Sequence, residues 1–198
     1  RENPETVLGQ INTAIRSHEL VFGTRPLGIW LPECAYYENL DEILFNCGIR
    51  YAVLDGHGIL NGSPRPRYGV YAPICSKNGV AFFGRDSEST LPVWSSREGF
   101  PGDPVYREFH KDLGWELSSS ELQKKGIPTS RPLGLKFHKI TDHKASLGKK
   151  EFYIEDEAIK KVEEHADIYL LSRSKQLKNL TLSSSFEPLL IAPFDAEL

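Results

Sequence analysis

Apolar positions along the chain follow two patterns that alternate with each other. Short apolar runs predict buried strands, and they fall at residues 27–31, 51–54, 69–74, 80–83, 133–140 and 189–192. Apolar residues recurring every three or four positions predict helices, one between a cap at Asn3 and a stop at Gly23 and others at 38–47, 103–113 and 154–180. The polar stretch 87–104 predicts a long loop, which in a compact domain is usually functional or mobile.

Strands that are apolar on both faces and alternate with amphipathic helices favour an α/β fold with a parallel sheet and helices around it. The sequence contains no solenoid-like repeat and no clear domain boundary. We therefore expect residues 1–198 to form part of a single domain.

The composition narrows the class of protein. The chain has 198 residues, of which 39% are hydrophobic and 26% charged, and the net charge is −3. This balance is typical of a soluble globular protein without the basic surface of a nucleic-acid-binding protein. No apolar run approaches the roughly 18 residues of a membrane span, and the first residues lack the apolar core of a signal peptide.

The three cysteines are widely spaced and form no Cys-x-x-Cys pair, so neither a zinc site nor a disulfide framework is expected. Reduced thiols predict a cytoplasmic location. The sequence indicates no metal or organic cofactor, and it leaves the oligomeric state open.

Polar side chains that follow the predicted strands are the candidates for chemistry, because active sites of parallel barrels gather where the strands end. They are Glu33, Asp55, His57, Arg85, Asp86 and Asp195. Glu33 and Asp195 both follow closely behind a proline that ends an apolar run. Two carboxylates at one edge are what cleavage of a glycosidic bond requires. Isolated acids after strands are more often helix caps or solvated loop residues.

The other candidates each have a structural alternative. His57 either contacts substrate hydroxyls or orders its own loop; Asp55 either orients His57 or caps the next turn. Arg85 and Asp86 form either a buried pair or part of a cleft. The aromatic residues, candidates for stacking on sugars or for core packing, are Trp30, Trp94, Phe100 and Trp115.

Residues 28–36 (Gly-Ile-Trp-Leu-Pro-Glu-Cys-Ala-Tyr) resemble glycoside hydrolase family 57, close to its 1,4-α-glucan branching enzymes. Nine successive residues agree, so the motif is specific. Residues 192–198 (Ala-Pro-Phe-Asp-Ala-Glu-Leu) are similar to the family's acid/base motif, and stretches 53–58, 80–86 and 99–109 also look like branching-enzyme sequence.

This resemblance implies a retaining enzyme on a seven-stranded parallel (β/α) barrel, of which only part is present in this chain. Glu33 matches the nucleophile, Asp195 matches the general acid/base, and no metal or organic cofactor is implied. The implied substrate is an α-glucan such as amylose, glycogen or starch, and the implied reaction transfers an α-1,4 segment to a 6-hydroxyl. Phe100 resembles, only weakly, the aromatic tip of a loop that covers the cleft.

The chain departs from the family in lacking the His-containing motif near the barrel's start and a Gly-His-Trp-Trp segment after its last residue. We therefore expect it to be the middle of a longer protein and to have little activity in isolation. An α-amylase or a 4-α-glucanotransferase of the same family is the main alternative. A non-catalytic glucan-binding fragment is another. A metal-dependent deacetylase is a third, although His138 and His143 are the only close histidine pair.

Overall fold

The first helix forms where its capping residues predict it. α1 (Pro4–Phe22) begins after Asn3, whose side chain accepts a hydrogen bond from the Thr6 N–H at 3.1 Å. It ends at Gly23, which adopts a left-handed conformation with φ 69°. The sequence prediction for this helix is confirmed.

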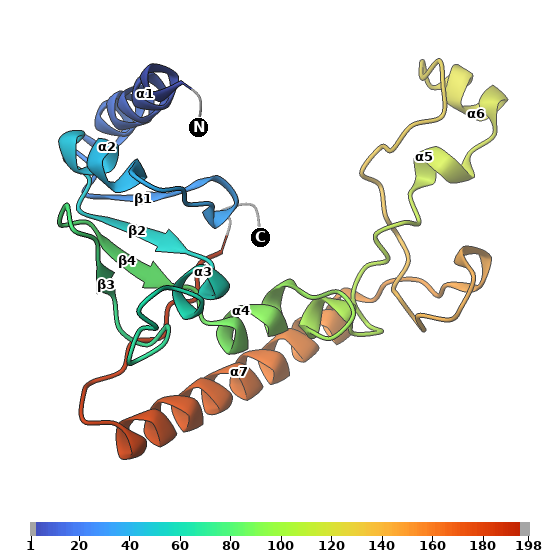
Figure 1. Cartoon of the computed structure of the whole chain (residues 1–198). Coiled ribbons are helices and arrows are strands. Elements are labelled where there is room, and N and C mark those ends of the chain that lie inside the picture. The colour runs from blue at the N-terminus through green and yellow to red at the C-terminus, as the bar shows by residue number, and fades with distance from the viewer. Residues whose placement is uncertain (1–2, 195–198) are drawn as a thin grey trace. The chain divides into compact units, whose positions relative to one another are not determined.

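The computed structural model describes residues 3–194, and these divide into two compact units (Figure 1). The first unit comprises the chain up to Thr90 together with the chain from Gln176 onward. The second unit is Leu91–Lys175.

The first unit is built on a four-stranded sheet with the strand order β1-β2-β4-β3. β1 (Gly28–Trp30), β2 (Tyr51–Leu54) and β4 (Ala81–Gly84) are parallel neighbours, whereas β3 (Ile74–Cys75) pairs antiparallel with β4. Gly28 allows β1 to approach β2, because a Cβ at that position would lie 2.1 Å from the Tyr51 ring. The α/β class and the parallel pairing are confirmed. The described strands form an open sheet and not a closed barrel.

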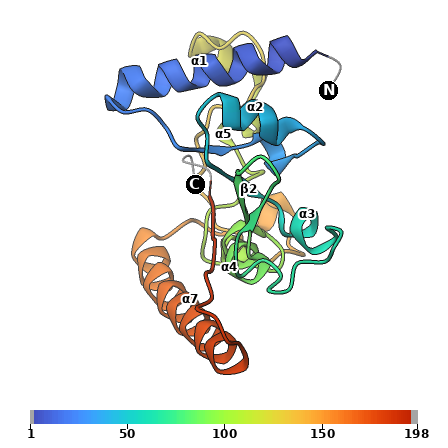
Figure 2. The ribbon, with the colours of Figure 1, turned by 60° about the vertical axis from the view of Figure 1, so that its left-hand side comes forward.

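Two helices join the parallel strands, α2 (Leu40–Asn46) before β2 and α3 (Gly56–Leu60) after it. α1 and α2 lie beside each other in both views of the ribbon (Figures 1 and 2). Buried side chains from α1, α2, α3, two of the strands and the segments that connect these elements make one core: Ile11, Ile15, Leu31, Leu40, Leu44, Cys47, Ile49, Ala52, Leu54, Ile59, Val70, Val80 and Phe82.

The second unit contains little regular sheet. Its elements are the end of α4 (Ser87–Trp94), the short helices η2 (Phe100–Gly102), α5 (Leu113–Glu116), α6 (Ser119–Lys124) and η3 (Leu147–Lys149), and most of α7 (Glu155–Ser183). In this unit, hydrogen bonds from side chains to the backbone take the place of those between strands. Asp112 accepts hydrogen bonds from the N–H groups of Gly114, Leu133 and Gly134 at 2.8–2.9 Å.

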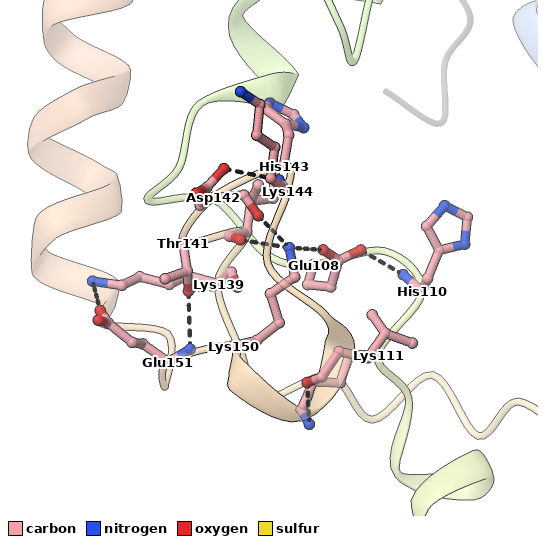
Figure 3. A network of polar contacts seen from close by, with 12 residues as sticks. Glu108, His110, Lys111, Lys139, Thr141, Asp142, His143, Lys144, Lys150 and Glu151 are labelled. Carbon is pink, nitrogen blue, oxygen red and sulfur yellow. Dashed lines mark hydrogen bonds and ion pairs between the residues drawn. The ribbon is translucent and has the colours of Figure 1, made fainter.

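The second unit also contains a buried ion pair, between Lys150 and Glu108 (Figure 3). The Lys150 ammonium lies 3.0 Å from the Glu108 carboxylate and 2.7 Å from each of the carbonyl oxygens of Ile140 and Asp142. Burial raises the pKa of Glu108, but hydrogen bonds from the His110 N–H and from Lys150 outweigh it and leave that pKa below its usual value.

Several predicted elements are wrong. β3 contains only the last residue of the strand predicted at 69–74, and the predicted loop 87–104 begins with α4. Residues 103–113 form no helix, because their backbone pairs instead with a distant segment: Glu108 N–H donates to His138 and Ile140 N–H to Tyr106. The predicted strand 133–140 forms only isolated bridges, Arg107 with Lys139 and His138 with Phe152.

The prediction of a strand at 189–192 is also wrong, although two backbone hydrogen bonds join this segment to Tyr71, before β3, and to Asp86, after β4. The helix predicted at 154–180 is confirmed as α7, in which Ala158 is the one buried residue among those described. No helix within residues 3–194 is both long and apolar enough to cross a membrane.

Candidate active site

The candidate side chains of the first unit follow strands that end at the same edge of the sheet. In the parallel register Trp30 lies opposite Val53, and Leu54 lies opposite Gly84. The residues that directly follow each strand are therefore neighbours along this carboxyl edge of the sheet. Such edges are where parallel sheets usually bind ligands.

Glu33 lies in a strained turn directly after β1. It belongs to the short helix η1 (Pro32–Cys34), and both Glu33 and Cys34 adopt left-handed backbone conformations, with φ of 53° and 50°. Each such conformation costs a non-glycine residue about 1–2 kcal/mol. Leu31 and Cys34 are buried on either side of the turn and hold it, while the Glu33 side chain is exposed. Its carboxylate forms no hydrogen bond or ion pair with another described residue.

The chain after this turn is fixed by a buried carboxylate. Asp41 accepts hydrogen bonds from the Tyr36 hydroxyl at 3.2 Å and from the Asn78 amide at 2.9 Å. Burial raises the pKa of Asp41, but hydrogen bonds from Ser76, Asn78 and Tyr36 outweigh burial and lower it below the usual range. Burial and the Asp41 charge raise the pKa of Tyr36 to about 12.

Asp55 and His57 form a hydrogen-bonded pair where β2 ends. Asp55 Oδ1 lies 2.7 Å from His57 Nδ1 and also accepts the His57 backbone N–H at 3.1 Å, so Asp55 caps α3 and orients the ring at once. Partial burial raises the pKa of Asp55, but the hydrogen bonds from His57 and the charges of His57 and Arg85 outweigh it and lower that pKa. The sequence left open whether Asp55 orients His57 or caps the next turn, and in the structure the same side chain does both.

Asp86 is a buried structural carboxylate beyond β4. It accepts the Ser89 N–H at 3.1 Å and the Ser89 hydroxyl, and the Gln176 amide lies 3.2 Å from it. These contacts begin α4 and attach the end of α7 to the sheet edge. Asp86 followed three positions later by Ser89 fits a helix start. Pro92 obscures this signal in the sequence, because proline is disfavoured inside a helix.

A cavity of about 400 Å³ opens at this edge. It is lined by Asp55, Gly56, His57, Leu60, Gly69, Val70, Tyr71, Arg85, Asp86, Ser87 and Glu88. Tyr71 was not a candidate in the sequence, because it lies inside the apolar run 69–74, where an aromatic residue is expected to pack in the core. The arrangement provides a donor in Arg85, an oriented imidazole in His57 and carboxylates at the rim of a cavity whose walls also include Leu60 and Val70.

The chain also returns to this edge near its other end. The Asp86 N–H donates to the Ile191 carbonyl oxygen, and the Leu189 N–H donates to that of Tyr71, each at 2.9 Å. The predicted acid/base residue Asp195 follows this segment but lies outside the described residues. Phe194 is the last residue that the structure describes.

The predicted aromatic contacts are divided between the two units. Trp30, at the end of β1 in the first unit, is 37% exposed. The second unit holds Trp94 at the end of α4, Trp115 in α5 and Phe100 in η2, with Trp115 the most exposed of the tryptophans at 57%. Phe100 stacks on the ring of His165 with the ring centres 4.5 Å apart.

A second cavity, of about 520 Å³, lies within the second unit. Its walls include Arg97, Arg107, Phe109, His110 and His143, and its buried carboxylate is Glu108. Glu108 is already paired with Lys150 (Figure 3), and Arg107 donates to the Lys136 carbonyl oxygen at 2.7 Å. These groups serve the packing of the unit.

Within residues 3–194, no three His, Cys, Asp or Glu side chains gather closely enough to hold a metal ion. The three cysteines carry free thiols, and Cys34 and Cys47 are buried.

Residues 2–186 match the family model for glycosyl hydrolase family 57, and the chain belongs to this family. The resemblance seen in the sequence is thereby confirmed. The chain is 31% identical over 220 residues to the 1,4-alpha-glucan branching enzyme TK1436 of Thermococcus kodakarensis, covering 98% of this chain and 30% of that protein.

Solved structures agree with this assignment. The alpha-amylase AmyC of Thermotoga maritima is 39% identical, with a TM-score of 0.87 over 98% of this chain and 38% of that one. The family 57 branching enzyme of Pyrococcus horikoshii is 30% identical, with a TM-score of 0.80 over 98% of this chain and 35% of that one. The chain thus spans between 30% and 38% of the length of these three relatives.

Proposed function

We propose that this chain is part of the catalytic domain of a retaining α-glucan-processing enzyme, and that its reaction is 1,4-α-glucan branching. The observation that carries the proposal is Glu33, an exposed carboxylate held in a strained turn at the carboxyl edge of a family 57 sheet. Strain of this kind persists where surrounding structure enforces it, and it is concentrated at functional sites.

In the proposed mechanism the Glu33 carboxylate attacks the anomeric carbon of an α-1,4-linked glucosyl unit. Asp195, as general acid, protonates the departing glycosidic oxygen, so a covalent glucosyl ester forms and the rest of the glucan leaves. Asp195 then takes the proton from an acceptor hydroxyl, whose oxygen attacks the same carbon and releases Glu33. Two inversions give overall retention. A glucan 6-hydroxyl as acceptor makes a branch, and water gives hydrolysis.

Trp30 and His57 are proposed substrate contacts in the first unit, and Trp94, Phe100 and Trp115 in the second. The proposed reaction takes place in a complete barrel to which this chain contributes one part. The Thermococcus and Pyrococcus relatives are both branching enzymes, which supports branching. A second candidate is α-amylase activity, because the Thermotoga amylase combines 39% identity with a TM-score of 0.87.

The test uses the complete protein that contains this chain, as wild type and as Glu33→Gln, acting on amylose. Products are debranched, and chain-length profiles are compared with the yield of new reducing ends. We expect wild type to make branches with few reducing ends, and Glu33→Gln to lose about a thousandfold or more in kcat. The matched control is Glu38→Gln, which removes an exposed carboxylate five residues further along and leaves activity unchanged.

Many reducing ends without branches would identify hydrolysis and favour the amylase alternative. Equal rates for Glu33→Gln and wild type would show that Glu33 is not the nucleophile.

A further inference from the structure

The Asp55–His57 pair holds an imidazole in one orientation at the mouth of the first cavity. One oxygen, Asp55 Oδ1, contacts both the backbone N–H and the ring Nδ1 of His57. The ring is therefore fixed relative to the end of β2. The His57 side chain is nevertheless 79% exposed. The contact with Asp55 therefore orients a ring that faces solvent.

The contact also fixes where the ring carries its proton. An ionised carboxylate only accepts hydrogen bonds, so Nδ1 must be the protonated nitrogen. In the neutral ring Nε2 then carries a lone pair and is a hydrogen-bond acceptor. Nε2 has no partner among the described residues, and His57 lines the cavity.

Arg85, the residue directly after the neighbouring strand β4, complements this acceptor. It lines the same cavity, and its guanidinium is a donor that cannot accept. One oriented acceptor and one nearby donor suit a pair of neighbouring hydroxyl groups, because a hydroxyl can donate to one partner and accept from another. Sugars present such pairs on adjacent ring carbons.

We propose that Asp55 is a positioning residue for substrate binding: it holds His57 in the Nδ1–H form so that Nε2 accepts a hydrogen bond from a glucosyl hydroxyl. Arg85 donates to the neighbouring hydroxyl of the same sugar. The proposal rests on the proposed function, since it places an α-glucan at the edge that carries Glu33. It assigns Asp55 a role in recognition in addition to its role as a helix cap.

Substitutions that preserve the cap separate the two roles. Asp, Asn and Ser are nearly equivalent as N-caps, so Asp55→Asn and Asp55→Ser keep α3 capped. Asparagine can still accept from Nδ1 through its amide oxygen, but serine is too short to replace the ring contact. A purely structural role predicts three proteins of equal affinity, whereas positioning predicts a graded loss from Asp to Asn to Ser.

The experiment measures kcat and KM for amylose with the complete protein. We expect Asp55→Ser to raise KM about tenfold, as for a lost hydrogen bond to substrate, with kcat changed less than threefold. Asp55→Asn falls between. His57→Ala raises KM to the same extent, and adding Asp55→Ser to it has no further effect. Asn3→Ser, which changes the cap of α1 in the same way, is the control with unchanged KM.

Nitrogen-15 NMR of the His57 ring supplies a readout independent of turnover. We expect the Nδ1–H form in wild type and a shift towards the Nε2–H form in Asp55→Ser. An Nε2–H ring in wild type, an unchanged KM in Asp55→Ser, or additive effects in the double variant would each overturn the proposal. Turnover lost only in Glu33→Gln, with normal KM in Asp55→Ser, would leave the proposed function standing. Absence of α-glucan turnover by wild type would instead overturn the proposed function and the recognition role with it.

Discussion

Replacing Lys150 with methionine removes one charge from the buried ion pair of the second unit and keeps most of the side chain's volume. The Lys150 side chain is 3% exposed, and its ammonium group contacts three oxygens, those of Glu108, Ile140 and Asp142, at 2.7–3.0 Å (Figure 3). After the substitution, the Glu108 carboxylate keeps only the hydrogen bond from the His110 N–H at 3.0 Å among its described partners.

The size of the effect follows from the uncompensated carboxylate. Removing one partner of a buried pair costs about 3–5 kcal/mol, because the other charge stays buried. The double variant Glu108→Gln with Lys150→Met leaves no charge, and the glutamine amide oxygen can still accept the His110 N–H. We expect the double variant to be more stable than Lys150→Met alone.

Hydrogen exchange on the complete protein measures this loss where it occurs. The Lys139 and Ile140 amides donate to Glu151 and Tyr106 across the unit, and their exchange should accelerate about a hundredfold or more in Lys150→Met. Lys161→Met is the control: it breaks the solvent-exposed pair that Lys161 forms one turn along α7 and should leave these amides unchanged. The reasoning fails if Lys150→Met exchanges like Lys161→Met, or if the double variant is less stable than the single one.

Two further predictions concern packing and pH. Gly114→Ala should lower the free energy of unfolding by about 3 kcal/mol, because its Cβ would lie 1.9 Å from the Arg131 carbonyl oxygen, whereas Gly148→Ala, with open space around it, should be neutral; urea unfolding distinguishes them. Because the folded-state pKa of Asp41 is lowered, its contribution to stability is complete above the unfolded pKa of about 3.9 and is lost as pH falls through the folded value. Urea midpoints measured across this range should therefore fall less steeply towards acid in Asp41→Asn than in wild type, while Glu42→Gln, at an exposed neighbouring position, should follow wild type.

The elements that could be predicted from sequence carry their own local signals. β2 has the bounds that its apolar run predicts, and α1 has the cap and stop that Asn3 and Gly23 predict. Parallel pairing could be predicted because such strands are apolar on both faces. The edge site followed from these strands, since their ends determine where Glu33 and His57 lie.

The second unit could not be predicted because its backbone is satisfied by distant partners. The apolar segment 133–140 has a strand-like composition, yet its N–H groups at Leu133 and Gly134 bind the Asp112 side chain. Residues 103–113 have helix-start residues, but Glu108 and Tyr106 pair with the 138–140 segment instead. Pairings between segments so far apart leave no periodicity in the sequence, and here these tertiary contacts override the local preferences for a helix and a strand.

Backbone strain separates a structural turn from the candidate site. Thr141, in the second unit, has a φ of 60°, which is rare for a β-branched residue. Its neighbours explain it, because Lys150 binds the carbonyl oxygens of Ile140 and Asp142 on either side and so stabilises the turn. At Glu33 the same conformation recurs, but the buried residues that hold the turn leave the carboxylate exposed and without a described partner. Strain at Thr141 serves a buried network, whereas strain at Glu33 places an acid at the sheet edge, where only a ligand or residues outside the described range can use it.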